Sequence, residues 1–389
     1  MSEVHEDRQF QSNVPLEVYP TWESMKLKPE LIEAIKKNGW EKPSPIQQRA
    51  IYIISQGKNI MFQSQNGSGK TATFSIGTLA RLRLTSKTTE LIIVSPTREL
   101  AIQTENTLKS LGANTRACVG GNSLGADVKA LQKSIHCVSG TPGRILQLLK
   151  EHNIQAEKVQ SVVLDEADEM LTSFKSTIMD ILQKLPHAQK VIVTATVSAD
   201  VVELATAHLR NAVEIRVPRD ELTLTGIDQY VVRVENEEWK FDALIDIYQS
   251  IAIEKAVIFV NSVEKGNWLK GKMVDSGFTV ALVHGQMTMD DRAKITEEFR
   301  SGEARVLIAT DVFSRGIDVR NVTLVINFDF ALTCDVYLHR IGRSGRFGRK
   351  GLAITLCAGE SDEMKLRKLE KYFSTKIGPL PSDLDALFF

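Results

Sequence analysis

The chain lacks several features that would narrow its class. It has no run of about 18 apolar residues, the length that a membrane-spanning helix needs, and no apolar segment after Met1 that would indicate a secretory signal. Its four cysteines are scattered without CxxC spacing, which favours a reduced, intracellular protein. Lys plus Arg and Asp plus Glu number 48 each, so the zero net charge excludes a histone-like polycation but allows a local basic face.

What the chain does have is a regular alternation of strand-like and helix-like segments. Its 389 residues are too many for one ordinary core, which indicates two or three domains. From Thr21 onward the apolar runs are continuous, as is typical of parallel strands that helices cover on both faces. A polar stretch that contains Pro218 separates two such series. We expect strands at residues 60–63, 91–95, 162–164 and 191–194, then at 256–260, 279–283, 305–309, 324–327 and 353–356.

These series predict an α/β fold with two tandem, doubly wound parallel-sheet domains joined by a short linker. The expected parts are a flexible segment 1–20, a first domain 21–216, a linker 217–226 and a second domain 227–389. In such sheets ligands bind at the carboxyl ends of the strands, and the polar motifs described below all fall at such ends.

The first motif is a glycine-rich loop, Ser64–Thr71, between a strand and a helix, as a Walker A loop requires. Gly67 and Gly69 let backbone N–H groups point at phosphate oxygens. Lys70 is expected to neutralise the β- and γ-phosphates, and Thr71 to offer its hydroxyl to Mg²⁺. A glycine-rich surface turn is the alternative interpretation. The expected phosphate-binding residues are Ser64, Gln65, Asn66, Gly67, Ser68, Gly69, Lys70 and Thr71.

The second motif is Asp165-Glu166-Ala167-Asp168, which follows the apolar run Val162–Leu164. We expect Asp165 to hold Mg²⁺ through water, and Glu166 to orient or deprotonate an attacking water. An acidic helix start is the alternative, because acidic side chains favour the positive end of a helix. Together with the loop, this motif describes a nucleotide site with ATP and Mg²⁺ as the expected cofactors.

With these motifs the chain resembles the DEAD-box family of ATP-dependent RNA helicases, which implies that both domains are RecA-like. The segment Gly39–Gln47 resembles the Q motif of the family. The resemblance implies that Gln47 reads the adenine edge with its amide and that Trp40 stacks on the base. Thr194-Ala195-Thr196 stands where the family has Ser-Ala-Thr, and the resemblance implies that Asp168, Thr194 and Thr196 couple ATP hydrolysis to strand separation.

The resemblance also implies a set of RNA contacts that bind phosphate and sugar without reading bases. In the first half of the chain these contacts lie in three loops. In the second half, one of them is Arg292 of the family's Gln-x-x-Arg element, in which Met289 replaces the glutamine. The sequence Val263-Glu264-Lys265 departs from a basic pair in the relatives, which predicts weaker RNA contacts there. The implied RNA-binding residues are Pro96, Thr97, Arg98, Gly121, Thr141, Arg144, Arg292 and Thr310.

The last family motif is His339-Arg340-Ile341-Gly342-Arg343-Ser344-Gly345-Arg346. The resemblance implies that Arg343 and Arg346 reach the γ-phosphate as arginine fingers, which stabilise transition-state charge. It also implies that His339 links to the region of Asp168 and Thr196, and that Asp318 binds the ribose.

Residues 220–227 and 238–242 resemble translation initiation factor 4A and its exon-junction and nucleolar relatives. This implies RNA-stimulated ATP hydrolysis with local unwinding of short RNA duplexes in translation initiation. An ATP-locked RNA clamp in an exon-junction-type or ribosome-biogenesis complex is the main alternative, and a P-loop kinase or GTPase is the other. We expect a monomer that binds single-stranded and short duplex RNA and a scaffold-type protein, without a membrane, in the cytoplasm or alternatively in the nucleus.

Overall fold

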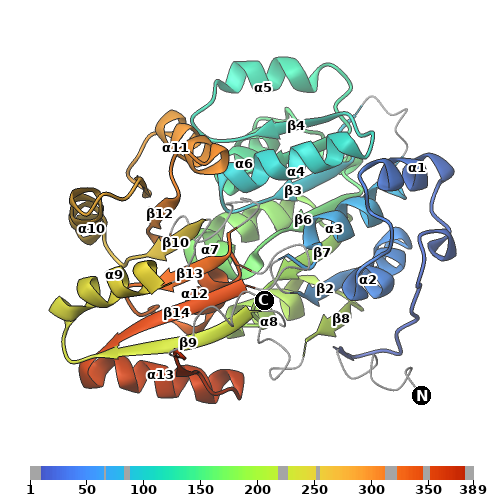
Figure 1. Cartoon of the computed structure of the whole chain (residues 1–389). Helices are drawn as coiled ribbons and strands as arrows, with labels where there is room; N and C mark the ends of the chain where they lie inside the picture. The colour runs from blue at the N-terminus through green and yellow to red at the C-terminus, as the bar shows by residue number, and fades with distance from the viewer. Residues whose placement is uncertain are drawn as a thin grey trace. The chain divides into compact units, whose positions relative to one another are not determined.

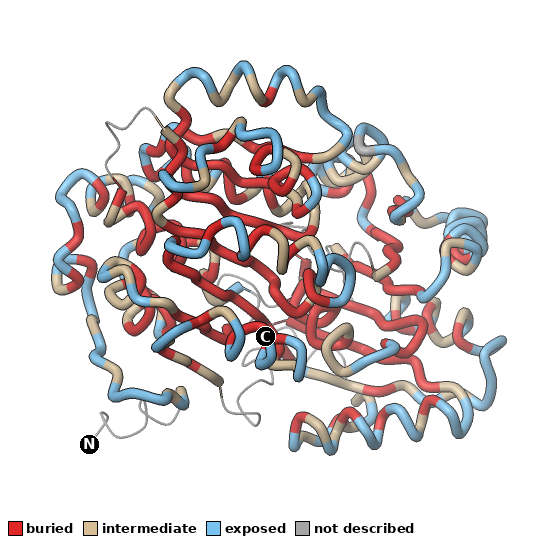
Figure 2. The backbone as a smooth tube through the Cα atoms, turned by 180° about the vertical axis from the view of Figure 1, so that it is seen from behind, coloured by how far each residue is buried: buried red, intermediate tan, exposed pale blue. Residues whose placement is uncertain are grey.

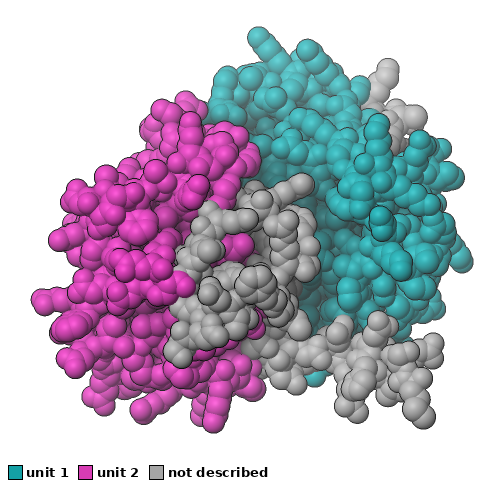
Figure 3. Space-filling view, viewed as in Figure 1, with its two compact units in different colours: residues 1–218 teal, residues 219–389 magenta. Residues whose placement is uncertain are grey.

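The computed structural model describes residues 10–64, 67–82, 88–217, 227–250, 255–311, 322–344 and 351–381. The chain divides into two compact units, residues 1–218 and 219–389 (Figure 3). In each unit the strands form a buried sheet, and the helices expose their outer faces (Figure 2). None of the helices in the described part of the chain is long and apolar enough to cross a membrane.

Unit 1 is built on an eight-stranded sheet in the order β1-β8-β2-β7-β6-β3-β5-β4 (Figure 1). All neighbouring pairs run parallel except β1 with β8. Every residue of β2, β3, β5, β6 and β7 is buried, because helices cover both faces of these central strands. The strands are β1 Gln11–Ser12, β2 Ile60–Gln63, β3 Leu91–Val94, β4 Thr115–Cys118, β5 Cys137–Gly140, β6 Ser161–Leu164, β7 Gln189–Thr194 and β8 Val213–Arg216.

Two hydrophobic clusters flank this sheet. Helices α1 to α4 contribute to one cluster, and helices α6 to α8 contribute to the other. Several helices begin at a hydroxyl side chain that accepts a backbone N–H of the first turn, as Thr97, Ser123 and Ser198 do. The helices are α1 Pro29–Lys37, α2 Pro45–Ser55, α3 Lys70–Leu79, α4 Arg98–Ser110, α5 Leu124–Leu131, α6 Pro142–Lys150, α7 Ala167–Lys184 and α8 Ala199–His208, with 3-10 turns at Glu23–Met25 and Ala156–Lys158.

The segment before Thr21 is more ordered than the sequence suggests from residue 10 onward. Strand β1 pairs with β8, and the Tyr19 ring lies 4.5 Å from the Tyr52 ring of α2, centroid to centroid. The Arg49 guanidinium lies over the Phe10 ring at 4.8 Å. Residues 10–20, part of the segment that we expect to be flexible, thus contact α2 through aromatic side chains.

Unit 2 has a seven-stranded parallel sheet in the order β11-β12-β10-β13-β14-β9-β15. Successive residues of β10 alternate between two hydrophobic clusters, to which α9 and α10 contribute on one face and α11 on the other. The strands are β9 Ile227–Val234, β10 Ala256–Phe259, β11 Val280–Val283, β12 Val306–Ala309, β13 Leu324–Asn327, β14 Gly351–Ala358 and β15 Gly378–Pro379. The helices are a 3-10 turn Glu237–Trp239, α9 Lys240–Ser250, α10 Val263–Asp275, α11 Met289–Ser301, α12 Cys334–Ile341 and α13 Gly359–Phe373.

The expected fold class is confirmed, and each strand expected from a continuous apolar run is present, with its ends within two residues of the expected ones. The strands β1, β4, β5, β8, β9 and β15 are not among the expected ones. The four-residue strands β4, β5 and β8 each carry a polar residue, and Asp228, Gln229 and Arg233 interrupt β9, so none of these four forms a continuous apolar run.

Candidate nucleotide and RNA site

The strand order of unit 1 brings its polar motifs to one edge of the sheet. In a parallel sheet the carboxyl ends lie at the same edge. The segments expected to bind nucleotide follow β2 and β6, and the segment expected to couple hydrolysis to unwinding follows β7, which lies between them. The segments expected to bind RNA follow β3, β5 and β4, which are also neighbours. This edge therefore has a nucleotide half and an RNA half, which meet where β6 pairs with β3.

The loop before α3 has the backbone shape that the glycines predict. Gly67 has φ = 81° and Gly69 has φ = 90°, in the left-handed region that glycine adopts without strain. A Cβ on Gly69 would lie 2.6 Å from the Gln47 Nε2 atom, so a larger residue there would displace the Gln47 amide. Lys70 opens α3 and is buried, and the half-buried Thr71 follows it. The start of α3 thus offers an ammonium group, a hydroxyl and a helix N-terminus to an anion.

The Q segment holds this loop through hydrogen bonds. The Ser44 N–H donates to Gln47 Oε1 at 2.7 Å, which caps the start of α2. Gln47 Nε2 donates to the Gly69 carbonyl at 3.4 Å, and the Ser44 hydroxyl donates to the Ser68 carbonyl at 2.8 Å. The Ser64 and Ser68 hydroxyls also share a short hydrogen bond. Both polar atoms of Gln47 therefore have internal partners, and each keeps one further hydrogen or lone pair with which to read an adenine edge.

Trp40, which is expected to stack on a base, lies half-buried and packs against the core cluster of α1 to α4. Its carbonyl accepts the indole N–H of Trp22 at 2.9 Å. Trp22 itself is only 1% exposed and is a core residue. Trp40 is thus held at the entrance to α2 by the core beneath it.

The acidic residues after β6 are buried and strained. Asp165 and Glu166 are 3% and 5% exposed. Glu166 has φ = 51° and ψ = 54°, a left-handed conformation that costs a non-glycine residue on the order of 1 kcal/mol and is typical of active sites. Burial, and then the neighbouring Glu166 carboxylate, raise the pKa of Asp165 to about 7, while the charge of Lys70 opposes the rise.

The residues expected to couple hydrolysis to unwinding form one hydrogen-bonded group. The Asp168 carboxylate, in the first turn of α7, accepts the Thr196 hydroxyl at 2.7 Å and the Thr196 N–H at 3.2 Å. The Thr194 hydroxyl donates to the Thr196 carbonyl at 2.7 Å. A threonine at position 194 thus keeps its hydroxyl bonded, and the turn after β7 is tied to the acidic segment after β6.

The residues expected to bind RNA in unit 1 also lie together. Residues 96–98 lead into α4, whose N-cap is Thr97. The N–H of Gly120 donates to the Thr141 hydroxyl at 3.2 Å. Gly121 has φ = 88°, and a Cβ there would lie 2.6 Å from a terminal nitrogen of Arg98. The three loops after β3, β4 and β5 therefore form one surface on which Arg98 lies against Gly121.

Arg144 differs from Arg98 because it points inward. It is 8% exposed, and its guanidinium donates to the Asp127 carboxylate and, at 2.7 Å, to the Asn122 carbonyl. Asp127 is fully buried and also pairs with Arg116 at 3.2 Å. The sequence singled out neither Asp127 nor Arg116. In this structure Arg144 holds the loop that follows Gly121 in place through its hydrogen bond to the Asn122 carbonyl.

In unit 2, the expected catalytic residues His339 and Arg343 lie in α12 and directly after it. His339 and Arg343 are buried, and Arg343 Nε donates to the His339 carbonyl at 3.2 Å. Thr310 is buried at the end of β12, and Arg292 is half-buried in the first turn of α11. His339 and Arg343 thus lie next to each other, at the end of α12, and apart in sequence from Thr310 and Arg292.

Arg340, between these two, joins α12 to the ends of three strands, β10, β12 and β13, and was not predicted as a site residue. It is fully buried, and it donates to Asp311 at 2.6 Å, to the Asp329 carbonyl at 2.8 Å and to Asn261 Oδ1 at 2.7 Å. Asp311 follows the expected RNA-binding Thr310. Arg340 therefore connects the helix expected to bind phosphate with a segment expected to bind RNA.

The structure also shows the surroundings of Glu264 and Lys265, which follow β10 and depart from the family pattern. Lys265 remains where the relatives have a basic pair, but its ammonium pairs with Asp329 and, at 2.9 Å, with Glu237. Glu264 beside it is exposed. These carboxylates offset the charge of Lys265. The other expected ligands Gln65, Asn66, Asp318 and Arg346 lie outside the described residues, as does most of the expected linker.

The comparisons with known proteins bear on the whole chain. The model of the DEAD/DEAH box helicase family matches residues 44–204, and that of the helicase conserved C-terminal domain matches residues 239–348. The ATP-dependent RNA helicase FAL1 of Meyerozyma guilliermondii is 50% identical over 99% of this chain and 98% of its own, and FAL1 of Saccharomyces cerevisiae is 47% identical over 97% of each. The chain is a DEAD-box ATP-dependent RNA helicase.

Solved structures of DEAD-box proteins support the same assignment. Saccharomyces cerevisiae Dbp5 bound to RNA and ADP BeF3 superposes with a TM-score of 0.87 at 32% identity, over 94% of this chain and 97% of that one. A DEAD box protein from Methanococcus jannaschii has a TM-score of 0.57 at 32% identity, over 94% of this chain and all of its own. Membership in this family makes ATP the nucleotide and RNA the polymer.

The residues of the nucleotide half also fit a magnesium ion. Mg²⁺ is usually bound by one or two carboxylates together with substrate phosphates and water, and not by a cage of protein ligands. Among the described residues no cluster of three or more His, Cys, Asp or Glu could hold a metal ion. Burial raises the pKa of Asp165, and a nearby cation favours the charged form of its carboxyl group. A DEAD-box protein that brings Mg²⁺ in with ATP needs no more than this.

Proposed function

We propose that unit 1 binds ATP with Mg²⁺ at the loop 64–71 and that Glu166 activates the water that attacks the γ-phosphate. The observation that carries this proposal is the strand order, which puts the loop, the acidic segment and the turn after β7 on three neighbouring strands. Lys70 binds the phosphates, and Thr71 and Asp165 hold the ion. When bound, Mg²⁺ offsets the charge that develops on the phosphate oxygens.

We propose that single-stranded RNA binds along the second half of the same edge, through Arg98, Gly121 and Thr141. These groups contact phosphate and sugar, so the binding is independent of sequence. The turn of Thr194 to Thr196 sits after β7, beside the acidic segment that borders the RNA half. Its bonds to Asp168 are the route by which RNA binding favours hydrolysis. The product of this coupling is local unwinding of short duplexes.

In the second unit, Arg343 and Arg346 are proposed to stabilise the γ-phosphate during transfer. A guanidinium can donate two hydrogen bonds to phosphate oxygens and stays charged at any working pH. Arg340, with its bonds to Asp311, Asp329 and Asn261, keeps α12 in place for this role. Arg292 and Thr310 are proposed RNA contacts of lesser strength, since Lys265 is offset by acids.

The relatives support a proposal for the biological role. Both the Meyerozyma and the Saccharomyces relative carry the name FAL1, and neither is named a translation initiation factor. This favours ribosome biogenesis in the nucleus, the alternative to the expected role in translation initiation in the cytoplasm. Dbp5 has been solved with Gle1, so a scaffold-type protein partner remains part of the proposal. We propose that the chain itself acts as a monomer.

The test measures RNA-stimulated phosphate release by the wild type, Glu166→Gln and Arg343→Gln. Loss of a catalytic carboxylate is expected to slow release by at least about 100-fold, with ATP binding retained. Equal rates for Glu166→Gln and wild type would refute the assignment of the base. Purification of the tagged protein from native extract addresses the role: pre-ribosomal RNA is expected, and initiation factors alone would contradict it.

A further inference from the structure

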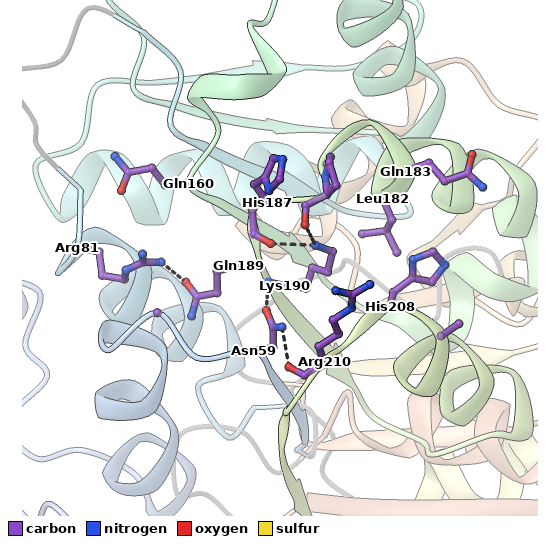
Figure 4. Close-up of a pocket in the computed structure, with 14 residues that line it drawn as sticks. Asn59, Arg81, Gln160, Leu182, Gln183, His187, Gln189, Lys190, His208 and Arg210 are labelled. Carbon is purple, nitrogen blue, oxygen red and sulfur yellow. Dashed lines mark hydrogen bonds between the residues drawn. The ribbon is translucent and has the colours of Figure 1, made fainter.

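A pocket of about 640 Å³ opens at the amino-terminal edge of the unit 1 sheet, opposite to the edge that carries the motifs (Figure 4). Gln189 and Lys190 open β7, Gln160 and Asn59 precede β6 and β2, and the remaining residues come mainly from the ends of α7 and α8. No residue assigned above to ATP or RNA lines it. The pocket is therefore a separate site.

The charged side chains that line the pocket are all basic. The lining contains three permanent cations, Arg81, Lys190 and Arg210, and two histidines, His187 and His208. Four amide side chains add further donors. None of the residues that line this described pocket is acidic. The lining is thus suited to an anion.

The floor of the pocket is rigid. Arg81 donates to Gln189 Oε1 at 2.7 Å and to the Ser161 hydroxyl at 3.2 Å. Gln189 Nε2 in turn donates to the carbonyls of Ile54 at 2.9 Å and Lys58 at 2.7 Å. Because this network joins α2, α3, β6 and β7, the groups above it are held in fixed positions.

Lys190 and Arg210 differ in whether their charged groups bond to the rest of the protein. Lys190 donates to the carbonyls of Leu185, Pro186 and Ala188, at 3.1, 3.2 and 2.9 Å, so its three protons are occupied. A cation at the end of a helix is an ordinary stabilising feature, and it explains Lys190. It does not explain Arg210, whose guanidinium has no hydrogen bond or ion pair with any described residue.

Arg210 instead faces other positive groups. Figure 4 shows its guanidinium directed into the pocket, between Lys190 and His208. Burial and then the charge of Arg210 lower the pKa of Lys190, and burial and then the charge of Lys190 lower the pKa of His208. The charges of Arg210 and Lys190 thus repel each other, and a bound anion would relieve the repulsion.

We propose that this pocket binds a backbone phosphate of the RNA, outside the RNA segment that Arg98, Gly121 and Thr141 contact. Guanidinium, amide and imidazole groups bind phosphate and sugar oxygens without reading bases. The apolar side chains of the lining are few (Leu182, Pro186, Ala188 and Ala207), which leaves little surface for the side chains of an acidic peptide. The pocket would let a helicase with zero net charge hold RNA that flanks the duplex.

The test compares Arg210→Gln with Lys133→Gln in the full-length protein. Lys133 is exposed, ends the helical turn after α5 and precedes β5, so it lies at the same edge of the sheet but outside the pocket. Both changes remove one positive charge. Binding is measured by fluorescence anisotropy, with a non-hydrolysable ATP analogue, on RNA of about 10 and about 40 nucleotides.

Arg210→Gln is expected to weaken binding of the long RNA by about 3- to 10-fold and to lower the slope of log K against log salt by about 0.7. Binding of the short RNA and the ATPase that it stimulates are expected to stay unchanged, as is every value for Lys133→Gln. Arg210→Lys should restore part of the loss. These results would leave the nucleotide site untouched, so failure here is distinct from failure of the proposed function.

Equal binding of the long RNA by wild type and Arg210→Gln would overturn the proposal. So would an equal loss on the short RNA, or an equal loss with Lys133→Gln, because either would indicate a general charge effect. Isothermal titration with AMP and with a poly-glutamate peptide covers the other sources of negative charge. Binding of AMP or of the peptide that Arg210→Gln abolishes, without an effect of RNA length, would also overturn it.

Discussion

Arg144 offers the sharpest test of how the RNA surface is built. The resemblance to the family implies that this residue contacts RNA, whereas its guanidinium is buried against Asp127 and the Asn122 carbonyl. We therefore expect Arg144→Gln to act through stability and loop position, and Arg98→Gln, on the half-buried Arg98, to act on RNA binding directly.

The size of the effect follows from the buried ion pair. Removing one partner of such a pair costs about 3–5 kcal/mol, because the other charge is left buried. Asp127 is fully buried but retains Arg116 at 3.2 Å, so the loss should lie near the lower limit, at about 3 kcal/mol. Arg98→Gln removes no hydrogen bond to another described residue and should change stability by less than about 0.5 kcal/mol.

The four tryptophans make the measurement specific to one unit. Trp22 and Trp40 belong to unit 1, and Trp239 and Trp268, both exposed, belong to unit 2. In a background of Trp239→Phe and Trp268→Phe, fluorescence during urea unfolding reports unit 1 alone. Thermal shift is a poorer choice because both units contribute to it.

Two outcomes would refute the reasoning. If Arg144→Gln unfolds at the wild-type urea concentration, the ion pair does not support the fold. If it also loses as much RNA affinity as Arg98→Gln, then Arg144 contacts RNA directly. A charge-neutral double variant, Asp127→Asn with Arg144→Gln, should recover part of the stability, since no buried charge is left alone.

Two further predictions concern the nucleotide half. Asp168→Asn should uncouple RNA from ATP, lowering RNA-stimulated hydrolysis while basal hydrolysis persists; its effect on stability, about 1–2 kcal/mol, should not add to that of Thr196→Val, as a double-mutant cycle would show. For Asp165, the raised pKa means that the folded protein keeps a proton that the unfolded chain releases above about pH 4. Without Mg²⁺ and ATP, this group should lower the free energy of unfolding between about pH 4 and pH 7 by at most about 1.4 kcal/mol per pH unit, and Asp165→Asn should flatten that part of the urea-derived profile.

The fold could be predicted where burial alone determines the sequence. Strands such as Leu91–Val94 and Val306–Ala309 are covered on both faces, so they consist of apolar residues only. The strand Thr115–Cys118 ends its sheet and includes the half-buried Arg116, and in β9, Ile227–Val234, only Ile227 and Val231 are buried. Because edge and half-covered strands carry polar residues, a rule that searches for apolar runs does not find them.

The strand order was beyond prediction for another reason. Periodicity identifies strands but does not say which become neighbours, and β7 lies between β2 and β6 although it follows both in the chain. That order decides that the nucleotide segments lie on adjacent strands. Motif spacing alone implied a site but not its division into two halves.

The partners of the site residues could not be predicted either, because they come from distant positions. Asp127 supports Arg144, and Arg340 joins Asn261, Asp311 and Asp329, without any local pattern in the sequence to mark them. Arg340 lies inside a recognised motif, but only its neighbours Arg343 and His339 were predicted as site residues, because their expected roles lie at the phosphate site. A residue that positions others becomes visible only through its contacts.

Gln47 shows why a motif does not by itself separate ligand binding from structure. Its amide caps α2 through Ser44 and contacts the loop carbonyl of Gly69, and both bonds use the atoms that adenine would need. Each of these atoms keeps a second hydrogen or lone pair, through which the base can bind while the loop stays bonded. Each such bond contributes about 1 kcal/mol net, and the shared amide links occupancy of the base site to the position of Gly69 and hence of Lys70. The same side chain can thus support the empty site and sense the filled one.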